Sequence, residues 1–396
     1  MNILVSREEL EKRMSRFREA MNQACPDWDT ALVVSKVNQY YFMGTMQDGM
    51  LLVRRDREPE YYVRRSFQRA KEESPLPYVY GMRSYRDAAE QAGADLGNVY
   101  TETDILTLAM GERLKKYFRM QTIKSLDKII LSLRAIKSPY ELAWAEASGR
   151  QHNDLLQNAV PSLLKEGMNE AELVGALYDK MIQYGYHGVS RFSQFQSEMV
   201  VGQIGFGPSS LYPTSFDGPG GALGMYPAVP LVGSRENRLA AGDLVFVDIG
   251  FGINGYHSDK TQVYIFKGKA TEAMKEAHQA CMEIQSKAAR LLKPGISASE
   301  VYDSVMQDLS PEFQNDFMGF GDRQVKFLGH GVGLHVDELP VIAPSFDEPL
   351  AENMVIALEP KKGIAGKGMV GVEETYIVEA SGGRCITGGA REIIEV

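Results

Sequence analysis

The sequence predicts a protein of mixed helix and strand, with a small α/β domain followed by a larger domain made of two related halves. The chain has 396 residues, which at roughly 150 residues per domain allows two or three domains. Short apolar runs alternate with helical stretches up to about Lys128. Beyond that point two segments resemble each other at a constant offset along the chain. We therefore expect domains at residues 1–128 and 129–396.

The composition excludes several classes of protein. There are 43 Lys+Arg against 52 Asp+Glu, a formal net charge of −9, which argues against a long nucleic acid as partner. The three cysteines, Cys25, Cys281 and Cys385, form no CxxC pair, so we expect neither a disulfide framework nor a zinc ribbon. No stretch approaches the ~20 apolar residues of a membrane span, and the N-terminus lacks the pattern of a signal peptide. These features favour a cytoplasmic protein in a reducing compartment.

The N-terminal segment opens with a predicted helix over residues 6–24. Its apolar residues recur at helical spacing, and Ser6 with Glu9 matches a capping box. Strands are expected in residues 31–34, 50–53 and 60–63. This part of the chain contains no histidine. We expect it to position the second domain or to mediate dimerisation, without taking part in chemistry.

The second domain contains an internal repeat. It is expected to open near Ser138, where Ser-Pro-Tyr-Glu is a helix-start signature. Residues 163–173 then resemble residues 291–301. Each copy has a glycine that ends one helix, then a capping residue and a glutamate that begin the next. The paired positions are Gly167 with Asn169, and Gly295 with Ser297. Gene duplication is the simplest explanation.

The repeat extends to two predicted strands that end in a carboxylate. Residues 243–248 end at Asp248 and residues 354–359 end at Glu359, and each is followed, after a turn, by a second carboxylate, Asp259 or Glu373. A single such aspartate is more often a turn residue that bonds backbone amides. Four of them at matching places favour a common role, because a partly desolvated carboxylate needs a cation. If the halves face each other, the four carboxylates converge.

A histidine bracketed by glycines is the other candidate ligand. His330 lies in Gly-His-Gly-Val-Gly, where small neighbours let the backbone approach a ligand. A neutral imidazole binds Zn, Mn, Fe or Co. Four carboxylates and one imidazole suit two divalent ions a few ångströms apart, which lower the pKa of a bridging water.

These segments, in this order and spacing, resemble metallopeptidase family M24, the pita-bread family of methionine aminopeptidase, prolidase, aminopeptidase P and creatinase. Residues 38–44 and 136–141 resemble the prolidase and creatinase branch. The resemblance implies an α+β fold, with a pseudo-twofold pita-bread domain after a small creatinase-type α/β domain. The metal ligands that it implies are Asp248, Asp259, His330, Glu359 and Glu373.

The resemblance further implies a dinuclear hydrolase that cleaves peptide bonds adjacent to proline, as an Xaa-Pro dipeptidase or Xaa-Pro aminopeptidase. Two divalent ions (Mn, Co or Zn) would hold the attacking water, and Glu359 would act as its general base. A homodimer and a small peptide substrate are also implied. Alternatives are a creatinase-like hydrolase of a non-peptide amide or guanidino compound, and a non-catalytic pita-bread binding protein. The retention of all five ligands argues against both alternatives.

Two histidines of the proline-specific peptidases are replaced in this sequence. Asp337 stands seven residues after His330, where the family has histidine, and His335 lies two residues earlier. If residues 334–338 are extended, His335 and Asp337 share a face and one can orient or protonate the other. Alternatively, His335 bonds only backbone or a dimer neighbour.

Substrate contacts are expected from three further residues. Met225 stands where the family has its second histidine, with Tyr226 beside it, and His257 shares a strand face with Asp259. Residues 202–224 are rich in glycine and proline, which favours a long loop that lines a pocket with Phe206, among other aromatic residues. The remaining histidines, at positions 152, 187 and 278, are expected to be structural or exposed.

Overall fold

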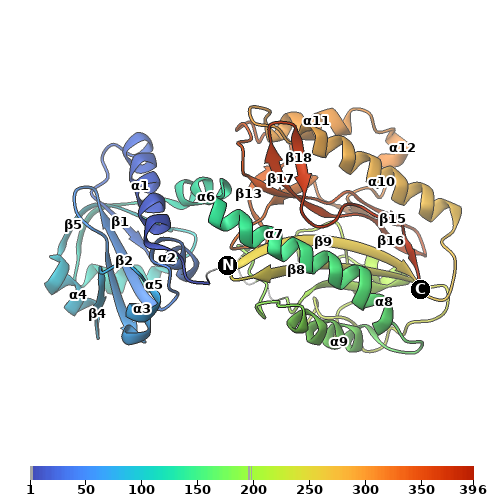
Figure 1. Ribbon diagram of the computed structural model, residues 1–396, viewed down its shortest axis with the longest axis horizontal. Coiled ribbons are helices and arrows are strands. Elements are labelled where there is room, and N and C mark those ends of the chain that lie inside the picture. Colours follow the sequence, from blue (N-terminus) through green and yellow to red (C-terminus); the bar gives the residue numbers. More distant parts are fainter. Residues whose placement is uncertain (1–2, 195–196, 198) are drawn as a thin grey trace. The chain divides into compact units, whose positions relative to one another are not determined.

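The computed structural model describes residues 3–194, 197 and 199–396. The chain divides into two compact units, Met1–Arg134 and Ala135–Val396 (Figure 1). The boundary expected after residue 128 falls inside helix α6 (Asp127–Ala135). No helix in the described part of the chain is long and apolar enough to cross a membrane.

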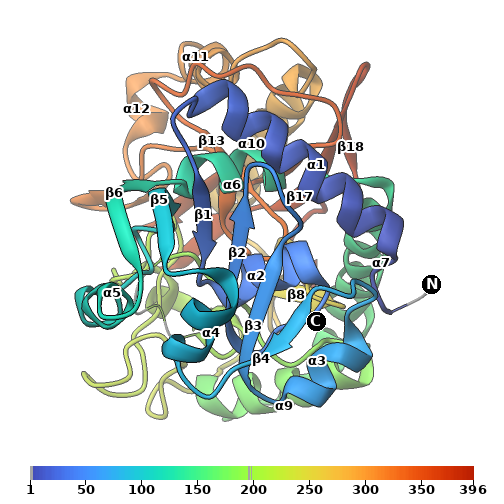
Figure 2. The same cartoon turned by 90° about the vertical axis from the view of Figure 1, so that its left-hand side faces the viewer.

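The first unit is built on one six-stranded sheet of order β4-β3-β2-β1-β5-β6, whose strands can be followed in Figure 2. Strand β1 pairs antiparallel with β2 and parallel with β5, so the sheet is mixed. Helix α1 begins where predicted, with the Ser6 side chain accepting from the Glu9 amide. The three strands expected from the sequence are β1, β2 and β3. The elements are α1 (Arg7–Ala24), β1 (Thr30–Val33), α2 (Lys36–Met43), β2 (Asp48–Arg54), β3 (Glu60–Arg65), α3 (Phe67–Glu73), β4 (Val79–Gly81), α4 (Tyr85–Ala92), β5 (Asp95–Thr101), α5 (Leu108–Lys115), β6 (Arg119–Ser125) and α6.

Capping boxes start three helices of the second unit where the sequence places them. Ser138, Asn169 and Ser297 each accept from the amide three residues later, while a glutamate bonds back to the cap. Gly167 and Gly295, at φ 80° and 91°, occupy matching turns before two of these caps, a conformation that favours glycine. The helical elements are α7 (Pro139–Asp154), the π-helix η1 (Leu155–Ala159), α8 (Val160–Leu163), α9 (Glu170–Gln183), the 3₁₀ helix η2 (Gly207–Leu211), α10 (Glu272–Leu291), α11 (Ala298–Met306) and α12 (Pro311–Gln314).

The second unit contains two main sheets, each built around one hairpin of the repeat. The first has the order β19-β9-β8-β7 and the second β13-β12-β14-β17-β18. The hairpins expected from the repeat are β8 with β9 and β14 with β17, both antiparallel. The strands are β7 (Gly202–Phe206), β8 (Leu244–Ile253), β9 (Tyr256–Ile265), β10 (Gly319–Phe320), β11 (Arg323–Gln324), β12 (Gly329–Gly331), β13 (Glu338–Ile342), β14 (Val355–Leu358), β15 (Lys361–Ile364), β16 (Gly368–Gly371), β17 (Glu374–Glu379), β18 (Gly382–Cys385) and β19 (Ile394–Glu395).

The two sheets are joined where β9 meets β17. The Thr261 amide donates to the Glu373 carbonyl at 3.2 Å. The Thr375 hydroxyl lies 2.8 Å from both the amide and the carbonyl oxygen of Asp259. A fully buried ion pair between Lys260 and Glu374 adds to this connection. Matching strands of the two halves therefore lie side by side.

Residues 202–211 do not form the loop that their glycine content predicts. Residues 202–206 are strand β7, which pairs with β8, and Phe206 is 1% exposed in the core instead of lining a pocket. Glycine serves close packing here, since a Cβ at Gly205 would lie 2.7 Å from the Ser210 amide nitrogen. Residues 212–243, in contrast, form turns and isolated bridges.

Candidate metal centre

The five residues predicted as ligands come from both halves of the second unit. Asp248 and Asp259 lie on the hairpin strands β8 and β9. His330 lies on β12, while Glu359 directly follows β14 and Glu373 directly precedes β17. Asp248 is in the middle of β8 and not at a strand end as expected, because the apolar run continues through the glycine-containing segment to Ile253.

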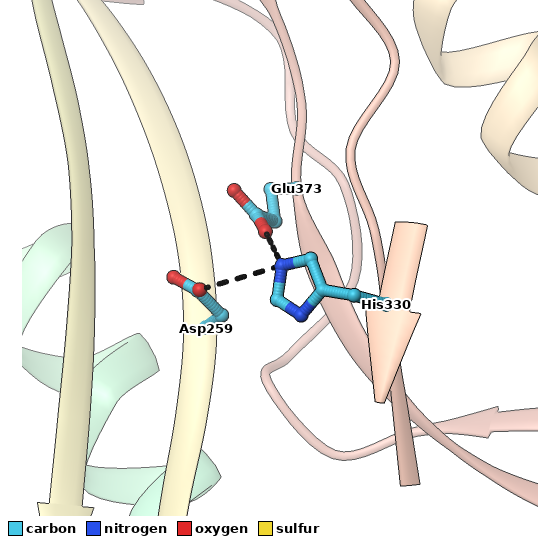
Figure 3. Close-up of side chains that lie close together, drawn as sticks. All are labelled: Asp259, His330 and Glu373. Atoms are coloured by element: carbon cyan, nitrogen blue, oxygen red, sulfur yellow. Dashed lines mark ion pairs between the residues drawn. The ribbon is translucent and has the colours of Figure 1, made fainter. Parts of the chain in front are cut away.

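Four of the five side chains surround one point. His330 Nε2 lies 3.9 Å from Asp259 Oδ2, 3.5 Å from Glu359 Oε1 and 3.8 Å from Glu373 Oε1. Figure 3 shows the imidazole turned toward the carboxylates of Asp259 and Glu373. Candidate ligand atoms of Asp259, His330 and Glu373 all lie within 4.8 Å of one another. We refer to this group, with Glu359, as the His330 corner.

The His330 corner fits a divalent cation. Glu373 Oε1 is buried, and none of the described residues shares a hydrogen bond with it. Burial and the nearby Glu373 carboxylate raise the pKa of Asp259 well above its usual value. Burial lowers the pKa of His330, but the charges of Glu359 and Glu373 outweigh it and raise the pKa overall. A cation here would compensate buried negative charge, and carboxylate with imidazole is a donor set that Mn, Co and Zn accept.

A lysine fills the other side of the cluster. Lys361, on β15, is fully buried and its Nζ donates to Asp248 Oδ2 at 3.0 Å, Glu359 Oε2 at 2.7 Å and Glu373 Oε2 at 2.7 Å. We refer to these three carboxylates as the Asp248 corner; their candidate ligand atoms also lie within 4.8 Å of one another. Burial raises the pKa of Asp248 to about 7 even though Lys361 lowers it.

Lys361 is a residue of this cluster that the sequence analysis did not identify. The available signal was its position two residues after Glu359, because alternate residues of an extended chain face the same side. A second residue missed in the same way is Thr261, whose hydroxyl lies 2.8 Å from Asp248 Oδ1 and 3.0 Å from Glu373 Oε2.

Residues 333–337 form a bend, so the extended conformation on which a shared face of His335 and Asp337 depended is not met. Asp337 accepts hydrogen bonds from the amide and hydroxyl of Ser193, both at 2.7 Å. The His335 amide donates to Glu338 Oε1 at 2.9 Å. These two carboxylates bond amides and a hydroxyl, and they fix the bend before strand β13 begins at Glu338.

His257 forms a hydrogen bond with the backbone at the start of this bend. It is fully buried, with Nδ1 2.9 Å from the Gly333 carbonyl oxygen, and burial lowers its pKa to about 4. It does share a strand face with Asp259, but its burial is a poor match for the substrate contact expected from the sequence. His152 and His278 are core residues, as expected.

The two loop residues expected to contact substrate, Met225 and Tyr226, lie on a tight turn. The amides of Met225 and Tyr226 both donate to the Val229 carbonyl, at 3.1 and 3.5 Å. Met225 is half-buried and Tyr226 is 55% exposed. Their contact with substrate stays a prediction.

A cluster of carboxylates and imidazole, assembled from two segments of the second unit, is the type of ligand set that metal-dependent hydrolases use. Residues 144–380 match the model of metallopeptidase family M24, and residues 13–136 match the creatinase/prolidase N-terminal domain. This chain therefore belongs to metallopeptidase family M24. The family confirms the expected pita-bread fold and the hydrolase class.

Relatives cover nearly the whole chain. An Xaa-Pro dipeptidase of Pyrococcus furiosus is 28% identical over 372 residues, which are 92% of this chain and 95% of the relative. The crystal structure of the prolidase from Pyrococcus horikoshii OT3 aligns with a TM-score of 0.79 at 26% identity, covering 97% of this chain and all of that one. An Xaa-Pro dipeptidase from Bacillus anthracis, at 22% identity and a TM-score of 0.79 over 98% of this chain and all of that one, shows the same fold.

Proposed function

We propose that this protein hydrolyses peptide bonds adjacent to proline in short peptides, in a reaction that depends on a bound divalent metal ion. One observation carries the proposal: in the His330 corner three buried carboxylates and a half-buried imidazole surround Glu373 Oε1, which shares no hydrogen bond with any described residue. The names of the relatives, Xaa-Pro dipeptidase and prolidase, support the substrate class. The second unit, Ala135–Val396, would carry the site.

Asp259, His330, Glu359 and Glu373 would hold the ion, with Mn, Co or Zn as candidates. When bound, the ion would polarise the scissile carbonyl and lower the pKa of water. Glu359 would take the general-base role, which is supported by its two contacts: Oε1 lies 3.5 Å from His330 Nε2, and Lys361 holds Oε2 at 2.7 Å. A fixed carboxylate beside the water can accept its proton and deliver it to the leaving nitrogen.

The substrate would meet side chains at the edge of the cluster. His335 is half-buried and follows the ligand strand β12, which supports a contact with the peptide. Asp337 bonds Ser193, so its proposed contribution is to hold the bend that presents His335. Met225 and Tyr226 would contribute from their exposed turn.

Two further properties belong to the same proposal. A homodimer follows from the family resemblance. A cytoplasmic location is supported by the three cysteines, which are free in the described structure. Size-exclusion chromatography tests the homodimer, and cell fractionation tests the location.

The decisive experiment compares Xaa-Pro dipeptides with matched Xaa-Ala dipeptides, after the protein is stripped of metal and loaded with Mn²⁺, Co²⁺ or Zn²⁺. Hydrolysis restricted to Xaa-Pro in at least one metal is expected. Glu359→Gln should lower kcat by at least about 100-fold, the lower range of general-base contributions. The control is Glu352→Gln, an exposed glutamate in the turn before β14, which should leave activity unchanged. A reconstituted protein without Xaa-Pro activity would contradict the proposal.

A further inference from the structure

Lys361 forms a complete set of bonds at the place where a second metal ion would bind. An ammonium group has three N–H donors, and Lys361 Nζ meets three carboxylate oxygens, from Asp248, Glu359 and Glu373, at 2.7–3.0 Å. These three oxygens belong to the same carboxylates that make up the Asp248 corner. The oxygens that a second ion would need are therefore already bonded to a cation.

The lysine side chain is held in place by its surroundings. It is 0% exposed, and its Nζ lies 6.0 Å from the centroid of the Phe246 ring. Its stem packs over the neighbouring strand, since a Cβ at Gly371 would lie 3.2 Å from Lys361 Cγ. A side chain enclosed in this way cannot leave the cluster without displacing its neighbours.

The two corners differ in a way that separates their roles. At the His330 corner Glu373 Oε1 is buried and shares no hydrogen bond with any described residue, whereas Glu373 Oε2 accepts from Lys361. The two oxygens of Glu359 also have different partners, because Oε1 faces His330 and Oε2 accepts from Lys361. Each glutamate thus offers one oxygen to the His330 corner and gives the other to the lysine.

Short-range repulsion favours the same division. The ammonium group of Lys361 already places a positive charge among the carboxylates of the Asp248 corner. A second divalent ion at this corner would lie within bonding range of the same oxygens as the ammonium group. Like charges at such short range repel strongly in a buried site.

We propose that the Lys361 ammonium group takes the place of the second metal ion, so that this chain binds one divalent ion, at the His330 corner. The inference rests on the proposed metal-dependent function and differs from the expectation of two ions drawn from the sequence. Asp248 then serves as a partner of Lys361 instead of a metal ligand.

Metal stoichiometry tests the inference directly. The full-length protein and Lys361→Ala are stripped with chelator, titrated with Mn²⁺ by calorimetry, and analysed by plasma mass spectrometry after desalting. One ion per chain is expected for the wild type and two for Lys361→Ala. Lys362→Ala is the matched control, because the neighbouring Lys362 Nζ points to the backbone carbonyls of Phe313 and Asn315, and it should bind one ion. A wild type that binds two ions, or a Lys361→Ala variant that still binds one, would overturn the inference.

Electron paramagnetic resonance gives a second measurement that needs no variant. An isolated Mn²⁺ ion gives a six-line spectrum, whereas two adjacent ions give a coupled multi-line spectrum. The saturated wild type should show six lines, and a coupled spectrum overturns the inference even if Lys361→Ala does not fold. A wild type that binds two ions and cleaves Xaa-Pro peptides overturns the inference alone. A wild type that binds no ion and cleaves nothing overturns the proposed function together with it.

Discussion

Removal of one partner from the buried ion pair between Lys260 and Glu374 should strongly destabilise the protein. Each residue directly follows a cluster carboxylate, Asp259 or Glu373, and successive residues of a strand point to opposite faces. The pair therefore lies on the opposite side of β9 and β17 from the candidate metal centre. The perturbation that we consider is Lys260→Met, which keeps most of the side-chain volume and removes the charge.

The cost of Lys260→Met depends on how deeply the ion pair is buried and on the other partners of Glu374. The side chains are 0% and 1% exposed, and apart from Lys260 the Glu374 carboxylate bonds the Thr387 hydroxyl and the Cys385 thiol. Removing one partner of a buried pair leaves an uncompensated charge and costs about 3–5 kcal/mol. At roughly 2–4 °C per kcal/mol for a unit of this size, Tm should fall by about 6–20 °C. Replacing both residues, as Lys260→Met with Glu374→Met, should recover most of the loss, because no charge is then left unpaired.

Differential scanning calorimetry at one fixed metal concentration measures the effect. The control is Lys267→Met, the same substitution in a pair with Glu166 whose side chains are 57% and 60% exposed, for which a loss below about 1 kcal/mol is expected. Equal Tm values for the two single variants would contradict this prediction. A double variant no more stable than Lys260→Met would refute it as well.

Three further predictions follow from other parts of the second unit. Chelation should lower Tm, and Mn²⁺ at 100 times its Kd should restore about 2.7 kcal/mol of stability; an unchanged Tm would contradict a metal centre. Burial lowers the pKa of His152, so the unfolded chain takes up the proton first and stability should fall as the pH drops below about 6.5, by up to about 1.4 kcal/mol per unit. Urea unfolding of His152→Phe should show a shallower pH slope, and equal slopes would exclude this histidine as the cause. Gly149→Ala should destabilise, since a Cβ would lie 2.3 Å from the Ile386 carbonyl oxygen, whereas Gly175→Ala, with open space around it, should gain about 1 kcal/mol; the same sign for both would be inconsistent with these contacts.

The parts of the fold that the sequence predicted well depend on short-range chemistry or on repetition. The capping boxes that begin at Ser138, Asn169 and Ser297 each involve only four consecutive residues, so they can be recognised without knowing the tertiary structure. The convergence of carboxylates was predictable because the same pattern occurs twice. Neither inference needed the distances between elements.

The errors concern residues whose environment comes from distant parts of the chain. The bend at residues 333–337 depends on Ser193, which binds Asp337 from a remote segment. The direction of the Lys361 side chain depends on strand β15 and on its enclosure by Phe246, whereas an isolated lysine is usually exposed. Glycine in residues 202–206 indicated a loop, and the structure uses it for close packing beside β8. Local patterns do not contain this information.

The division of the cluster between two halves of the chain has a consequence for folding kinetics. Asp248 and Asp259 belong to the first half, while His330, Glu359 and Glu373 belong to the second. Neither half alone presents a complete set of ligands, and bringing the halves together requires closure of a long loop. A cation that binds after this step stabilises the native state more than the folding transition state. Metal would then slow the unfolding of this protein while leaving its rate of folding nearly unchanged, so that its lifetime, and not its speed of formation, would depend on metal supply.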